Sequence, residues 1–220
     1  DRVEMTYTDD LIVKIDNKTG KILFKKSITE ILVENNYSGL LFNTVDYRED
    51  PIHINDIQPA LDSCAFWNKG DLFLSLRNLT SIVQYRPSTN KVIWLTQGPF
   101  LNQHDVDIIS DKEISIFNNN MNWAWGSNYT EESNVEVSYT LKHNEIVTYD
   151  FEKKEFSKPF LEHFLNEKIN TRSEGLSEFL STGDVFVEEQ NIGVIFVIGD
   201  QGVILRKRFN NSSQKWTHMT

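Results

Sequence analysis

Two histidines and one arginine stand out, because imidazole and guanidinium groups can together bind and transfer an anionic group. His53, Arg77 and His104 each lie beside a segment with the pattern of a β-strand, and they are 24 and 27 residues apart. Histidine can act as a nucleophile or an acid–base group, and arginine can anchor a sulfate, phosphate or carboxylate. The three side chains could share one pocket if the strands that carry them lie side by side.

The same residues also have purely structural interpretations. A histidine at the start of a strand often hydrogen-bonds a neighbouring strand, and an arginine after a strand often pairs with a surface carboxylate. A metal site built from His53, His104 and Asp105 or Asp56 is a weaker interpretation, because Arg77 would repel a cation there. We therefore expect no metal and no cofactor. The sequence contains no glycine-rich phosphate loop, nucleophile elbow or CxxC pair.

The composition favours a folded protein with an acidic surface. The 220 residues are 39% hydrophobic and carry a formal net charge of -10, so the chain can bury a core without a disulfide and nucleic acid is an unlikely type of partner. Cys64 is the single cysteine, which excludes an internal disulfide. No apolar run reaches about 18 residues, so no membrane span is expected.

A hairpin pattern recurs along the chain, with two apolar segments flanking a turn rich in polar residues or glycine. The hairpins are expected at residues 11–24, 81–95, 146–156 and 194–205. Three of them follow an earlier pair of strands, whose tight turns are expected at 68–71, 110–113 and 181–184. Units of four strands that recur every 45 to 65 residues or so are typical of β-propeller blades.

We therefore predict an all-β fold, a β-propeller of four-stranded antiparallel blades, of which about 3.5 are visible. Residues 1–220 are expected to form a single propeller domain or part of one. A half blade is expected at about 1–38, and blades at about 53–100, 104–160 and 174–209. Closed propellers usually have more blades than this, so we expect another chain or segment to complete the ring.

Two segments depart from the strand pattern. Phe160 to Lys168 has apolar residues at helical spacing. Asn118 to Asn134 is a long polar segment that contains Trp123 and Trp125. This second segment could form a lid over a site on the propeller axis, or it could be an ordinary solvated loop.

The stretch from His53 to Asn120 resembles the arylsulfotransferase family, whose members are six-bladed propellers. The resemblance rests on the order and context of short segments: His53-Ile54-Asn55, residues 70–78 (GDLFLSLRN), 82–85 (IVQY), 92–94 (VIW), 103–105 (QHD) and 116–119 (IFNN). Residues 174–209 are similar to the family's following blade.

The resemblance implies a reaction. Family members of the bacterial type move a sulfuryl group from an aryl sulfate to a phenol, without a nucleotide donor and through a sulfated histidine. On this chain it implies that His104 is the nucleophile, and that Arg77 and His53 hold the sulfuryl oxygens. It also implies small-molecule aryl sulfate and phenol as partners, and an extracytoplasmic location, periplasmic or secreted.

Five further residues are expected to contact the substrate: Asn55, Asn78, Asp105, Trp123 and Trp125. The alternative is a non-catalytic propeller that binds a ligand or a protein through its central funnel and the tryptophan-containing loop. Fold and motif alone do not decide between them, because one fold hosts many functions.

Overall fold

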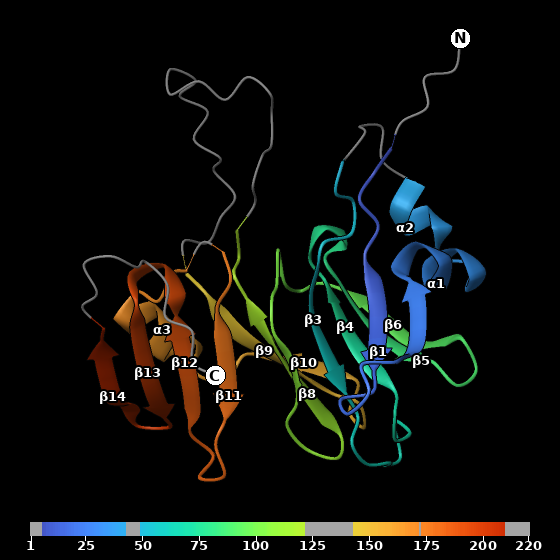
Figure 1. The fold of residues 1–220 in the computed structure, drawn as a ribbon. Coiled ribbons are helices and arrows are strands. Elements are labelled where there is room, and N and C mark those ends of the chain that lie inside the picture. Colours follow the sequence, from blue (N-terminus) through green and yellow to red (C-terminus); the bar gives the residue numbers. More distant parts are fainter. Residues whose placement is uncertain (1–5, 43–48, 122–142, 172, 210–220) are drawn as a thin grey trace, which may run out of the picture. The chain divides into compact units, whose positions relative to one another are not determined.

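The structure is a computed structural model that describes residues 6–42, 49–121, 143–171 and 173–209. In these ranges the strands form three four-stranded antiparallel sheets and one two-stranded sheet (Figure 1). Each four-stranded sheet pairs its strands in chain order, as propeller blades do. The prediction of an all-β fold with about 3.5 blades is therefore confirmed. The chain divides into two compact units, residues 1–97 and 98–220.

The first unit contains a hairpin, two short helices and one complete blade. The hairpin is β1 (Leu11–Ile15) with β2 (Ile22–Ser27), and the helices are α1 (Ile28–Glu34) and α2 (Ser38–Phe42). The blade consists of β3 (Ile54–Pro59), β4 (Leu72–Leu76), β5 (Ser81–Arg86) and β6 (Lys91–Gln97), with a single 3-10 turn, η1 (Arg77–Leu79), between β4 and β5.

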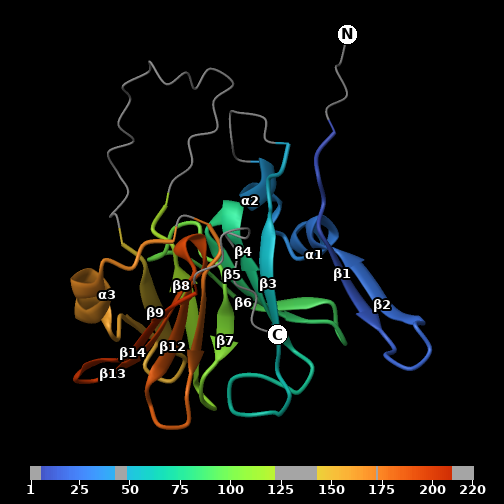
Figure 2. The same cartoon turned by 60° about the vertical axis from the view of Figure 1, so that its left-hand side comes forward.

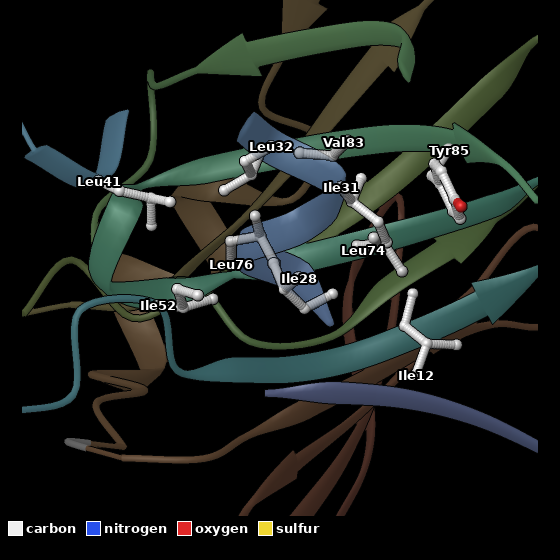
Figure 3. Packing of buried hydrophobic residues seen from close by; sticks show 10 residues of the cluster. All are labelled: Ile12, Ile28, Ile31, Leu32, Leu41, Ile52, Leu74, Leu76, Val83 and Tyr85. Carbon is white, nitrogen blue, oxygen red and sulfur yellow. The ribbon is translucent and has the colours of Figure 1, made fainter. Parts of the chain in front are cut away.

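The core of the first unit lies between α1 and the blade. Ile28, Ile31 and Leu32 are almost completely buried, and they pack with apolar side chains of β4 and β5 (Figure 3). The helix begins after Ser27, whose hydroxyl accepts a hydrogen bond from the Glu30 amide at 3.1 Å. A segment expected to belong to the half blade is thus helical. The spacing of these apolar residues and the Ser-x-x-Glu pattern are the signals that indicate it.

The second unit contains two blades and one helix. The first blade is β7 (Val106–Ile108), β8 (Glu113–Asn118), β9 (Glu145–Asp150) and β10 (Glu155–Ser157). The helix α3 (Leu161–Glu167) follows, which confirms the helical spacing expected there. The second blade is β11 (Leu176–Phe179), β12 (Val185–Glu189), β13 (Val194–Gly199) and β14 (Gly202–Arg208), with a 3-10 turn, η2 (Gln190–Ile192), between β12 and β13.

These two blades lie side by side in both views (Figure 2). Phe117 of β8 shares a buried cluster with Val185 and Val187 of β12 and with Phe164 of α3. Such face-to-face burial explains why the inner strands are apolar on successive residues instead of alternating with polar ones. Within the described residues, no helix is long and apolar enough to cross a membrane.

The 3-10 turns η1 and η2 occupy the same place in their blades, and each holds the loop that precedes the first strand of its blade. Each turn places an asparagine at its second position. Asn78 donates from its side chain to the backbone oxygen of Asp50 at 2.7 Å, and Asn191 accepts from the Ser173 amide at 3.3 Å. In both blades the asparagine therefore holds the loop that leads into the first strand.

Candidate functional site

Two predicted catalytic residues, His53 and Arg77, are neighbours in the first unit. His53 directly precedes β3, and Arg77 directly follows β4. These strands are antiparallel, so the start of one meets the end of the other. The Arg77 amide donates to the His53 carbonyl oxygen at 3.0 Å, and the Asn78 amide donates to the Ile52 carbonyl oxygen at 3.0 Å. The strand pairing thus joins the backbones of His53 and Arg77, and a shared pocket for their side chains stays a prediction.

His53 is held in an unusual conformation. Its φ angle is 52°, which lies in the left-handed region and costs of order 1–3 kcal/mol for a residue other than glycine. Its Nδ1 lies 2.5 Å from Oδ2 of Asp50, and 41% of its side chain is exposed. Among the described residues, Nε2 of His53 has no hydrogen-bond partner. In the neutral ring, the proton lies on Nδ1 towards the carboxylate and Nε2 carries the lone pair.

Arg77 is a half-buried cation with unused hydrogen-bonding capacity. Its Nε is buried and has no hydrogen-bond partner among the described residues. Burial lowers the pKa of the guanidinium from its ordinary value, and the negative charge of Asp50 partly opposes that shift. A buried donor without a partner costs about 1–3 kcal/mol. An oxyanion placed beside Arg77 would remove that penalty.

His104 lies in the second unit, just before β7, and both of its ring nitrogens are engaged. Nδ1 lies 2.7 Å from Oδ1 of Asn119, while the Glu174 amide donates to Nε2 at 2.9 Å. The Asn119 side-chain amide donates to the carbonyl oxygens of Glu174 and Thr171, so its Oδ1 must face the ring. The two contacts agree on one neutral tautomer, with the proton on Nδ1 and the lone pair on Nε2.

Asp105 links the two blades of the second unit, β7–β10 and β11–β14. Its Oδ2 accepts a hydrogen bond from the Ser177 amide at 2.8 Å, which ties the start of β7 to the first strand of the next blade. Asp105 and His104 therefore have a structural role as a link between adjacent blades. Substrate contact by Asp105 stays a prediction.

The remaining predicted residues are placed as follows. Asn55 lies within β3 and is half-buried, and Asn78 lies in η1. Trp123 and Trp125 lie outside the described residues, and so does most of the loop expected to form a lid. His53 and Arg77 belong to one compact unit and His104 to the other. The shared pocket of these three residues thus stays a prediction.

The sequence reasoning missed two residues that hold the histidines. Asp50 contacts His53, and Asn119 contacts His104. For Asn119, a usable signal was the run of three consecutive asparagines, residues 118–120, that begins with the last residue of the buried strand β8. Asp50 gave only a weak signal, because its position depends on η1, which lies far along the chain. Within the described ranges, no group of three or more His, Cys, Asp or Glu side chains could hold a metal ion.

Comparison with protein families decides the affiliation of the chain. The model of the arylsulfotransferase (ASST) family matches residues 2–210. The chain belongs to this family. As an arylsulfotransferase-family member it carries a family domain that supports an arylsulfotransferase-like function. A comparison with curated proteins gives no match.

Solved structures with similarity to this family member include two bacterial proteins. Virginiamycin B lyase from Staphylococcus aureus is 14% identical with a TM-score of 0.43, and the match covers 75% of this chain and 44% of the lyase. A protein of unknown function from Bacteroides caccae is 10% identical with a TM-score of 0.39, and the match covers 91% of this chain and 73% of that protein. The chain thus spans less than half the length of the lyase.

Proposed function

We propose that this protein transfers a sulfuryl group from an aryl sulfate to a phenol without a nucleotide donor. The observation that carries the proposal is the half-buried Arg77, whose Nε lacks a partner among the described residues and whose neighbour His53 has an exposed ring. A sulfuryl group offers several oxygens, and a guanidinium binds such groups through two parallel hydrogen bonds. Membership of the arylsulfotransferase family supports the same substrate class.

In the proposed reaction, a histidine carries the sulfuryl group between donor and acceptor. Nε2 of His104 forms a bond to sulfur while the bond between sulfur and the aryl oxygen breaks, and the phenoxide leaves with that electron pair. The Asn119 contact favours this role, because it keeps the lone pair on Nε2. The Glu174 amide now occupies that lone pair, so attack requires this hydrogen bond to open.

The second candidate function is a non-catalytic propeller that binds a ligand or a protein. It is favoured by the same Glu174 contact, since a histidine bonded at both ring nitrogens is also what a structural link between blades requires. The family affiliation is compatible with either function. We further propose an extracytoplasmic location, which is supported by the family resemblance alone.

The deciding experiment is incubation of the protein with 4-nitrophenyl sulfate. The proposal expects release of nitrophenol and a protein that gains the mass of one SO3 group, with the adduct mapped to His104 by peptide sequencing. His104→Asn should abolish the adduct. His163→Asn should retain it, because the His163 ring contacts the backbone oxygen of Asp200 and the Phe160 ring and is not one of the predicted site residues. A wild-type protein that forms no adduct with any aryl sulfate supports the non-catalytic function.

A further inference from the structure

A carboxylate outside the predicted set of site residues holds the ring of His53. Oδ2 of Asp50 lies 2.5 Å from Nδ1 of His53. The other carboxylate oxygen, Oδ1, is buried and has no hydrogen-bond partner among the described residues. The backbone oxygen of Asp50 accepts from the Asn78 side chain at 2.7 Å. The turn η1 therefore fixes the position of this carboxylate relative to the imidazole.

This arrangement is more ordered than stability alone explains. Ion pairs on partly exposed side chains contribute little to folding, and His53 and Asp50 are 41% and 38% exposed. Yet His53 adopts a left-handed backbone conformation, and its side chain is not part of the hydrophobic core of this unit. A strained residue whose ring is aimed by a fixed carboxylate is typical of a functional site.

We propose that Asp50 is a positioning residue that keeps the Nε2 lone pair of His53 available to accept the proton of the acceptor phenol. The proposal rests on the proposed sulfuryl transfer and gives His53 a proton-transfer role in addition to binding. Asp50 acts through His53, since its carboxylate fixes the Nδ1-protonated tautomer and stabilises the imidazolium that forms.

The proton and electron changes balance in both half-reactions. When the phenol attacks, its O–H bond breaks and the proton moves to Nε2 of His53. The phenol oxygen forms a bond to sulfur while the N–S bond of the sulfohistidine breaks, and the electron pair of that bond returns to the histidine nitrogen. That proton then passes from Nε2 of His53 to the phenoxide that leaves in the next donor half-reaction, whereas in the first turnover the phenoxide leaves as the anion and takes its proton from water.

Charged groups of both signs lie around this segment. The Asp50 carboxylate contacts the His53 ring and also interacts with the positive charge of Arg77. Asp10 accepts a hydrogen bond from the Ile54 amide at 2.9 Å and contributes a further negative charge on this side of β3. Glu49 is exposed and directly precedes Asp50. It serves as a matched control, because Glu49→Gln removes the same charge without touching the ring.

The kinetic test compares Asp50→Asn with Glu49→Gln in single-turnover reactions. Nitrophenol release reports the donor half-reaction, and loss of the SO3 adduct on adding phenols of increasing pKa reports the acceptor half-reaction. In Asp50→Asn we expect the acceptor step to slow by at least about tenfold, as loss of an oriented general base does. The slowing should be greater for less acidic phenols, which need a proton acceptor most. Glu49→Gln should stay within about twofold of wild type.

A second measurement tests Asp50 without relying on turnover. Long-range 1H–15N correlations of the full chain report which nitrogen of His53 carries the proton, and His53→Asn assigns the signals. The inference expects the Nδ1–H tautomer in wild type and in Glu49→Gln, and a mixture of tautomers in Asp50→Asn. Equal tautomers or equal acceptor rates in the two variants would overturn it. If wild type forms no SO3 adduct, the proposed function fails, and the spectra still decide whether Asp50 positions the ring.

Discussion

At the scale of single residues, Arg77 shows how strand pairing fixes the position of a side chain and its degree of burial. It follows β4 and begins η1, so its backbone is fixed by the His53 carbonyl while its guanidinium is half-buried. Burial lowers the pKa of Arg77, yet a guanidinium stays charged over the whole working range of pH. Its Nε–H is directed into the protein without an acceptor in the described residues. We therefore expect the guanidinium to bind a tetrahedral anion with several oxygens, such as a sulfate.

Arg77→Lys should therefore weaken sulfate binding although it keeps the charge. Lysine has neither the planar fork nor the Nε donor, and loss of one charge-assisted hydrogen bond, about 1.5–3 kcal/mol, corresponds to a drop of about tenfold or more in affinity. The measurement is the increase in melting temperature with added sulfate, which needs no turnover. Arg86→Lys is the matched control, since Arg86 pairs with Asp71 at 2.7 Å. That variant should lower stability and leave the sulfate effect intact. Equal sulfate effects in wild type and Arg77→Lys would contradict the role of Arg77.

At the scale of elements, the strands and turns were predictable because their signals are local. The hairpin at β1 and β2 and the tight turn before β4 follow from apolar segments around Asn, Asp and Gly, and the structure has both. The helix α1 was missed although Ile28, Ile31 and Leu32 have helical spacing. Asp50 was missed because its contact with His53 depends on Asn78, 28 residues further along. Asp50 and His53 are only three residues apart, but the hydrogen bond from Asn78 that holds the Asp50 backbone is long-range and has no local signal.

A close approach between the two blades of the second unit gives a stability prediction. Gly175 has φ +104°, and a Cβ at this position would lie 2.3 Å from Cε1 of Phe117 and 2.8 Å from Cγ2 of Thr171. Both neighbours belong to the packed interior, so Gly175→Ala forces overpacking of about 1–3 kcal/mol, in addition to about 1–2 kcal/mol for the left-handed backbone.

Gly183→Ala separates these two contributions. Gly183 also has a positive φ, +88°, but nothing lies within 4 Å of its Cβ position. Urea unfolding should show that the free energy of unfolding falls more in Gly175→Ala than in Gly183→Ala. The difference between the two variants should equal the overpacking contribution. If the free energy of unfolding falls by a similar amount in both variants, the Phe117 ring leaves room for a Cβ at position 175 and the overpacking is absent.

At the scale of the whole molecule, the acidic character predicted from the sequence includes carboxyls that the fold buries. The chain has 32 Asp and Glu against 22 Lys and Arg. Glu189, at the end of β12, is 2% exposed, and its Oε2 has no hydrogen-bond partner among the described residues. Burial raises the pKa of Glu189 to about 7, and the positive charge of Arg208 opposes the shift only partly. Sequence alone did not distinguish this carboxyl from a solvated one, because its burial arises from the tertiary fold and not from a local pattern.

This shift predicts how the stability of the protein depends on pH. The folded-state pKa of Glu189, about 7, lies above its ordinary value of 4.5. As pH rises from about 4.5 to 7, the unfolded chain therefore loses a proton that the folded chain retains, and the free energy of unfolding falls by a few kcal/mol. Glu189→Gln cannot ionise, so urea unfolding should show a variant similar to wild type at pH 5 and more stable than wild type at pH 8. Glu178→Gln, on an exposed position of β11, should keep the wild-type pH dependence. If Glu189→Gln keeps it as well, Glu189 is already ionised in the folded protein at neutral pH, and its carboxylate must then be solvated or paired in a way that compensates for its burial.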